Sequence, residues 1–267
     1  MPLRVHHLNC GTMRPVGGDL VCHCLLIESD DGLVLVDTGF GLQDIARPNR
    51  RVGRVLRVLS RPVLDPGETA QARTRALGLD PADVRHIILT HLDSDHAGGL
   101  SDFPRATVHV SPRMLANVRP SVPLRFAGRM RAVQWAHGPR WSTTPPYAAE
   151  LLGLPSAPLP FGGGDLHVVP LEGHVPGHIG VAVRRSEGRT PWLLHVGDAS
   201  FSHRAFTGDR TPLPLLLSEV VVRTDRRAWS ETRTSLSELA QRHTDEVELV
   251  CAHDPGGLPS DPSGLDR

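Results

Sequence analysis

The residues best suited to chemistry lie in one short segment, 91–96, which contains two histidines and two aspartates. The apolar run at residues 87–89 precedes this segment and is typical of a buried strand. Imidazole and carboxylate groups are the usual protein ligands of zinc, iron and manganese. Because buried histidine and aspartate side chains are costly unless they are paired or bound to a metal, their position beside a core strand indicates a metal site.

Three later apolar runs each end at a residue of the same kind. Residues 166–171 precede His174, residues 192–196 precede Asp198, and residues 247–250 precede His253. Four predicted strand ends therefore present ligand-type residues in the order His-x-Asp-x-Asp-His, His, Asp and His. Each segment alone is a weak signal, whereas the ordered set is specific.

This ordered set resembles the metallo-β-lactamase superfamily, whose usual pattern is His-x-His-x-Asp-His followed by His, Asp and His. The resemblance runs from the N-terminal strands to His253, and it is strongest to the N-acyl-homoserine lactonase branch at residues 91–99, 173–178 and 198–200. Asp37 also fits, as the aspartate that ends an early strand below the site. The resemblance implies an α/β fold, an αββα four-layer sandwich with mixed β-sheets and the metals at one edge of both sheets.

The resemblance also implies a binuclear metal centre in a hydrolase. One ion would be held by His91, Asp93 and His174, the other by Asp95, His96 and His253, and Asp198 would bridge them. Two divalent ions, zinc in the first place, would activate a shared hydroxide that attacks an ester-like bond such as that of a lactone. Asp95 and Asp198 are the expected catalytic residues. No motif indicates a side-chain nucleophile.

Two residues depart from the family pattern. Asp93 stands where these hydrolases usually have histidine; a third carboxylate would make the centre a weaker Lewis acid and would favour manganese or iron more than histidine does. Asp93 could also reach a metal only through water. Phe201 stands where the lactonases carry a tyrosine that helps to stabilise the oxyanion. Phenylalanine donates no hydrogen bond, and loss of one oxyanion donor can cost ~10²-fold in rate, so the lactone itself is an open assignment.

Other functions share this ligand pattern. A di-iron redox enzyme of the flavodiiron type, which carries a glutamate at the position of Asp93, would need a separate electron donor. Phosphodiesterases and arylsulfatases are further hydrolases of the family, and a non-catalytic metal-dependent binder is also compatible. Metal analysis together with an oxygen-consumption assay would separate redox chemistry from hydrolysis.

The overall composition and charge limit the kinds of partner that the protein is expected to bind. The 267 residues include 29 Lys and Arg and 29 Asp and Glu, which gives a formal net charge of zero. This balance disfavours a nucleic acid or an acidic membrane as partner, and no stretch approaches the ~18 apolar residues of a membrane span. The sequence predicts a small-molecule substrate and a cytoplasmic location with reduced cysteines. It does not indicate the oligomeric state.

One domain, residues 1–267, is expected. Apolar runs around Ser29–Gly32 predict a β-hairpin, and Asp225 begins a predicted amphipathic helix. Residues 120–164, rich in proline and tryptophan, suggest an irregular insertion that covers the substrate. His178 and His195 are expected behind the ligands rather than among them, and Asp254 is expected to orient His253.

Overall fold

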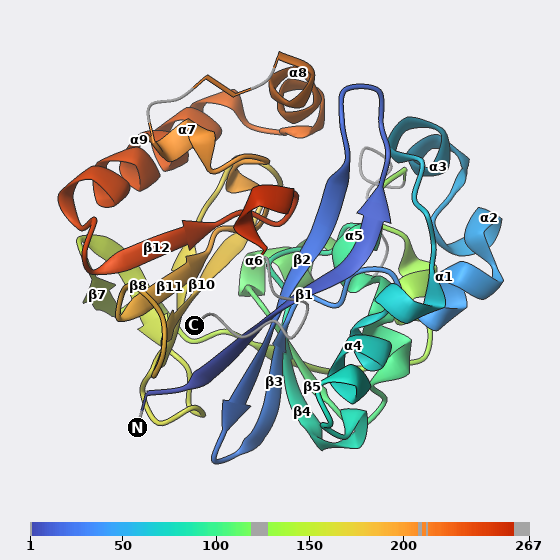
Figure 1. Cartoon of the computed structure of the whole chain (residues 1–267), viewed down its shortest axis with the longest axis horizontal. Coiled ribbons are helices and arrows are strands. Elements are labelled where there is room, and N and C mark those ends of the chain that lie inside the picture. Colours follow the sequence, from blue (N-terminus) through green and yellow to red (C-terminus); the bar gives the residue numbers. More distant parts are fainter. Residues whose placement is uncertain (1, 119–127, 208–209, 212, 259–267) are drawn as a thin grey trace.

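The computed structural model describes residues 2–118, 128–207, 210–211 and 213–258. Two six-stranded sheets face each other, and helices cover the outer side of each (Figure 1). In order across the first sheet lie β1 (Arg4–Met13), β2 (Leu20–Ser29), β3 (Gly32–Val36), β4 (Val84–Ile88), β5 (Thr107–Val110) and β6 (Arg140–Thr143). Across the second lie β12 (Val247–Val250), β11 (Trp192–His195), β10 (Ile179–Arg184), β9 (Leu166–Pro170), β8 (Leu154–Pro158) and β7 (Ala149–Leu151).

Both sheets are mixed, as the sequence predicts. β1, β2 and β3 pair antiparallel, whereas β3 to β6 pair parallel. In the second sheet β11 and β12 are parallel and the other pairs are antiparallel. The predicted hairpin is confirmed: β2 and β3 pair up to Ser29 and Gly32, and Gly32 has the positive φ of 106° that favours glycine. The αββα prediction is therefore confirmed.

The core between the two sheets follows from side-chain alternation along the strands. On β2, Leu25 and Ile27 point between the sheets and pack with Val181 and Leu193 of the second sheet. The intervening Leu26 belongs to a second cluster, beneath the helices of the first sheet. Cys22 and Cys24 share that outer cluster, as predicted for alternate residues of a strand, and both are buried free thiols. β2 is therefore apolar on both faces.

The helices of the first half are short: α1 (Leu42–Ala46), α2 (Pro48–Arg51), α3 (Arg54–Ser60) and α4 (Ala70–Ala76). They lie on the outer side of the first sheet (Figure 1). α5 (Ser94–Ala97) and α6 (Pro112–Val118) follow β4 and β5.

The helices of the second half are α7 (Arg204–Thr207), α8 (Leu213–Val222) and α9 (Arg226–Arg242). α9 packs on the second sheet through Leu236 and Leu239. The Asp225 side chain caps α9 as predicted, since it accepts hydrogen bonds from the backbone N–H groups of Arg227 and Ala228 at 3.0 Å. Within the described residues, every helix is too short or too polar to cross a bilayer.

Residues 120–164 are more regular than the sequence indicates, so the expectation of an irregular segment is wrong for the residues described, while their role as a cover for the substrate stays a prediction. β6, β7 and β8 lie within this segment; β6 and β7 are edge strands of the two sheets, and β8 lies between β7 and β9. Trp135 and Trp141 pack against the core of the first sheet. Strands of three to five residues among prolines show too little alternation to be recognised, because sheet pairing and not local propensity holds them. The part of the predicted cover at 120–127 lies outside the described residues.

Candidate metal centre

The structure brings all seven predicted ligands to one place. Asp93, Asp95 and His96 lie at or just after the start of α5, close behind the end of β4; Asp198 follows β11, and His253 follows β12. Possible ligand atoms gather in three overlapping groups, which are His91 with Asp93 and His174, Asp95 with His96 and His253, and His91 with His96 and Asp198. All seven side chains are buried. Asp95 is the most exposed of them, at 8%.

Asp198 lies between two pairs of imidazoles. Its Oδ1 is 3.3 Å from Nε2 of His96 and 3.2 Å from Nε2 of His253. Its Oδ2 is 3.2 Å from Nε2 of His174 and 3.8 Å from Nε2 of His91. Ligand atoms that share one tetrahedral zinc ion at about 2.0–2.2 Å would lie roughly 3.3–3.6 Å apart. Each carboxylate oxygen of Asp198 therefore faces its own prospective metal position.

Several buried polar atoms in this centre have no hydrogen-bond partner among the described residues. They include Nε2 of His91, Nε2 of His96 and Oδ1 of Asp198. Unpaired buried polar atoms cost free energy, and a bound cation would satisfy all three. The residues present thus fit a divalent metal ion.

Outer hydrogen bonds orient the ligand imidazoles. Nδ1 of His96 lies 2.8 Å from Oδ2 of Asp37, and Nδ1 of His253 donates to the carbonyl oxygen of Val21 at 2.8 Å. Each contact leaves Nε2 directed toward Asp198, which is the usual arrangement of a metal-binding histidine. Asp37 also accepts hydrogen bonds from the N–H and the hydroxyl of Thr90, both at 2.8 Å. Asp37 thus lies directly behind the centre, where the resemblance places it.

The charges around Asp198 keep it ionised. Burial by itself would raise the pKa of this carboxyl, but His253, His96 and His174 together hold its pKa well below the usual value. Burial likewise opposes the charge on His96, yet Asp198 and Asp37 raise the pKa of this imidazole well above its usual value. The centre therefore presents a carboxylate that is ready to bind a cation.

His178 and His195 belong to none of the candidate ligand groups among the described residues, and their ring nitrogens have other partners. Nδ1 of His178 donates to the carbonyl oxygen of Leu171 at 2.9 Å, and its Nε2 accepts from the backbone N–H of Asp198 at 3.1 Å. Nε2 of His195 donates to the carbonyl oxygen of His23 at 2.7 Å. Both nitrogens of His178 are thus used, and this residue orients Asp198.

The prediction that Asp254 orients His253 is wrong. Oδ2 of Asp254 contacts the backbone nitrogen and Nδ1 of His203, at 2.7 and 2.6 Å, and its Oδ1 accepts from the N–H of Gly256. The backbone turns between the two residues, so Asp254 points away from the imidazole. The partner of His253 is instead the carbonyl of Val21 on β2, which lies 232 residues earlier in the chain.

Arg129 is the residue that the sequence analysis missed. Its Nε donates to Oδ2 of Asp93 at 2.7 Å, and its Nη2 contacts both Asp93 and Nε2 of His174. Burial opposes the charge of Arg129, but Asp93 outweighs burial and raises the pKa of the guanidinium. Burial and the neighbouring Arg129 lower the pKa of His174 to about 4. A third buried aspartate does call for a cation, but nothing local indicates which arginine supplies it.

Phe201 and Glu219 shape the loop that follows Asp198. The ring of Phe201 meets that of His253 edge to face, with 4.8 Å between centroids. The buried carboxylate of Glu219 accepts from the Ser200 hydroxyl at 2.9 Å and from the backbone N–H of Phe201 at 2.6 Å, and Arg233 donates to it at 2.7 Å. Glu219 thereby fixes where the Phe201 ring lies relative to the centre.

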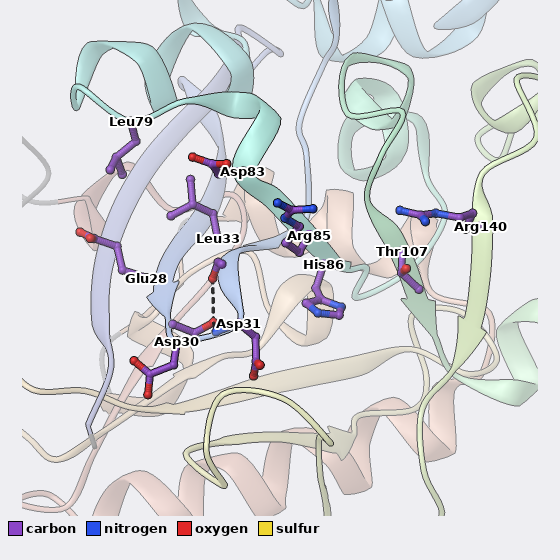
Figure 2. A pocket seen from close by; sticks show the side chains of 12 residues that line it. Glu28, Asp30, Asp31, Leu33, Leu79, Asp83, Arg85, His86, Thr107 and Arg140 are labelled. Atoms are coloured by element: carbon purple, nitrogen blue, oxygen red, sulfur yellow. Dashed lines mark hydrogen bonds between the residues drawn. The ribbon is translucent and has the colours of Figure 1, made fainter.

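A separate open cavity of about 680 Å³ lies away from this centre (Figure 2). His86, Thr107 and Arg140 line it from the beginnings of the parallel strands β4, β5 and β6, together with the β2–β3 turn. The predicted ligands follow the opposite ends of the strands, and none of them lines this cavity. The cavity therefore takes no part in the chemistry of the metal centre.

Known proteins match the chain over almost its whole length. A family model described as the metallo-β-lactamase superfamily matches residues 17–253. A probable metallo-hydrolase of Mycobacterium tuberculosis is 44% identical over 257 residues, covering 95% of this chain and 81% of the relative. An N-acyl homoserine lactonase, AttM, of Azorhizobium caulinodans is 27% identical and covers 96% and 90% of the two chains. The solved structure of a mutant of B. thuringiensis AiiA with bound N-decanoyl-L-homoserine superposes with a TM-score of 0.68 at 18% identity, covering 96% of this chain and 95% of the other.

Proposed function

The chain belongs to the metallo-β-lactamase superfamily, and from this premise we propose a metal-dependent hydrolase that cleaves an ester-like bond in a lactone or a related small molecule. The observation that carries the proposal is the position of Asp198, whose two oxygens face two different pairs of imidazoles. This arrangement suits a carboxylate that bridges prospective metal positions. The lactonases among the relatives support the choice of substrate class.

The prospective ligands form two sets that share Asp198. Asp95, His96 and His253 would hold an ion on the side of Oδ1, and His91, Asp93 and His174 form the set on the side of Oδ2. Zinc is the first choice for imidazole and carboxylate ligands, while the additional carboxylate of Asp93 also suits manganese or iron. When bound, a divalent ion would lower the pKa of a water molecule and polarise the scissile carbonyl.

The chain's own groups position the reactants. Water adds through its oxygen to the acyl carbon, the acyl carbon–oxygen bond of the ring breaks, and the proton of the water ends on the leaving alkoxide. Asp95 and Asp198 are the carboxylates that we assign to hold the reacting water and carry its proton. His178 orients Asp198 through the backbone N–H. Phe201 supplies an apolar wall against His253 and no hydrogen-bond donor.

The proposal is tested by chelation together with a substrate panel. Purified protein is expected to open N-acyl homoserine lactones or related esters, to lose this activity after EDTA treatment, and to regain it when zinc or manganese is added back. Product formation is followed by chromatography on lactone, ester, phosphodiester and sulfate substrates. Metal-loaded protein that hydrolyses none of them, yet consumes oxygen when supplied with a reductant, would move the assignment to redox chemistry.

Replacing Phe201 with tyrosine is expected to raise kcat/KM for lactones by about tenfold to a hundredfold. The added hydroxyl would supply an oxyanion donor beside His253, and one such donor typically changes rates by 10²-fold or more. Phe201→Leu is the matched control, because it alters the ring without adding a donor and should bring no increase. An unchanged or lower kcat/KM in the tyrosine variant, at wild-type metal content, would show that the Phe201 ring does not face the reacting carbonyl.

A further inference from the structure

The two sets of prospective ligands are not equivalent, because Arg129 lies against only one of them. Its guanidinium contacts Asp93 and His174, and its Nη1 also donates to the carbonyl oxygen of Val222, which holds the side chain in place. Within the part of the chain that the structure describes, no arginine forms a hydrogen bond or ion pair with Asp95, His96 or His253. The two sets therefore differ in that only the set on the Oδ2 side of Asp198 has an arginine beside it.

Arg129 uses the atoms that a metal ion would need. A guanidinium only donates hydrogen bonds, so Nε2 of His174 offers it the same lone pair that would bind a metal. Oδ2 of Asp93 likewise accepts from both Nε and Nη2 of Arg129. On the Oδ1 side of Asp198, Nε2 of His96 and Oδ1 itself have no hydrogen-bond partner among the described residues, and on the Oδ2 side the same holds for Nε2 of His91 and Oδ1 of Asp93. Arg129 thus occupies lone pairs of two of the three ligands on the Oδ2 side, Asp93 and His174, and of none on the Oδ1 side.

The charge balance points the same way. Asp93, Asp95 and Asp198 carry three negative charges, which equal those of one divalent ion plus one guanidinium. A second divalent ion would leave two positive charges in surplus over these three ligand carboxylates, or one if the buried Asp37 behind His96 is counted, because an arginine does not release its proton there. A site with too much positive charge binds its last cation weakly.

Resting on the hydrolase function above, we propose that this chain works with one tightly bound divalent ion, held by Asp95, His96, Asp198 and His253, and that the Asp93–Arg129 pair replaces the second ion. The guanidinium then supplies the positive charge beside the substrate carbonyl that a second metal supplies in a binuclear centre. This assignment differs from the two-ion centre that the resemblance implies. The proposal also explains why aspartate stands at position 93, where the family usually has histidine. A neutral imidazole there would leave Arg129 without a counter-ion.

The proposal is tested by counting metals. Protein purified without chelator and dialysed against metal-free buffer is expected to hold one equivalent of zinc per chain by elemental analysis, and calorimetric titration with zinc should show a second site at least tenfold weaker. Arg129→Met should raise the count to two. Arg131→Met is the matched control, because the hydrogen bonds of this neighbouring arginine's side chain to the described residues go to the carbonyl oxygen of Arg50, and this variant should remain at one.

Each other result has a defined meaning. Two equivalents of similar affinity in the wild-type protein would overturn the proposal and leave the hydrolase assignment intact. An Arg129→Met protein that still binds one equivalent would also overturn it, because the guanidinium would then not be the cause. No bound metal in any variant would overturn the hydrolase assignment itself. If Arg129→Met does not fold by circular dichroism, the double variant Asp93→His with Arg129→Met, which removes the unpaired carboxylate, is expected to bind two.

Discussion

Asp198→Asn is expected to lower kcat/KM on the proposed ester or lactone substrates by about 10³-fold. Among the described residues, Asp198 is the only carboxylate that lies within 4 Å of all four imidazoles, those of His91, His96, His174 and His253. An amide removes its negative charge and turns an NH₂ donor toward one pair of imidazoles. Metal-ion catalysis is worth several kcal/mol, and each 1.36 kcal/mol is about tenfold in rate. Steady-state kinetics at fixed metal concentration, with metal content measured in parallel, give the result.

Asp254→Asn is the matched control for this change. Asp254 is a buried aspartate near the centre, but its carboxylate contacts His203 and Gly256 and does not face the ligands. Its amide variant should keep its bound metal and most of its activity. If Asp198→Asn retained more than a tenth of wild-type kcat/KM with full metal content, Asp198 would not be an essential carboxylate of the metal centre.

Asp37→Asn is expected to weaken metal binding by about tenfold to a hundredfold and to lower the free energy of unfolding of the metal-free protein by about 3 kcal/mol. Asp37 accepts hydrogen bonds from the N–H and hydroxyl of Thr90 and contacts His96, so an amide NH₂ must face at least one donor. Loss of an outer partner of a ligand typically costs 10–100-fold in metal affinity, and breaking a buried ion pair costs 3–5 kcal/mol. Calorimetric metal titration and denaturant unfolding measure the two effects.

Backbone strain is not expected to contribute to the effect of Asp37→Asn. Asp37 has a positive φ of 58°, and asparagine adopts that region as readily as aspartate does. Asp44→Asn is the control, since Asp44 is equally buried but contacts Arg51, Gly41 and Gln134 away from the ligands. It should lower stability and leave metal affinity unchanged. Equal metal affinity in Asp37→Asn and wild type would show that Asp37 does not act through His96.

The Asp93–Arg129 pair separates this chain from the pattern that it resembles. A single substitution in the ligand motif, histidine to aspartate, is accompanied in space by an arginine that neutralises it. If one ion and one guanidinium balance the charge of the three carboxylates, a water molecule bound to that ion would be the only water in the centre whose pKa a metal lowers strongly. The metal count, and not the identity of the motif, then decides how the substrate carbonyl is polarised.

The sequence by itself indicated which histidines and aspartates would lie together. An apolar run indicates a strand and therefore where it ends, so His91, His174, Asp198 and His253 are recognisable from the apolar runs that precede them. The hairpin turn, the helix cap at Asp225 and the alternation of Cys22 and Cys24 are local in the same way, because each depends on neighbours within a few residues. Local periodicity also sets which face of a strand is buried.

Only the tertiary structure decided which distant groups meet these residues. The partner of His253 is a carbonyl on β2, and the short strands β6 to β8 exist because a sheet edge is available for them. Arg129 lies 36 residues from Asp93, among many arginines of the chain, and nothing within a few residues of either marks the pair. A hydrogen bond depends on position to within a few tenths of an ångström. The order of strands and the path of the connections set that position, whereas the local pattern sets only the direction of a side chain.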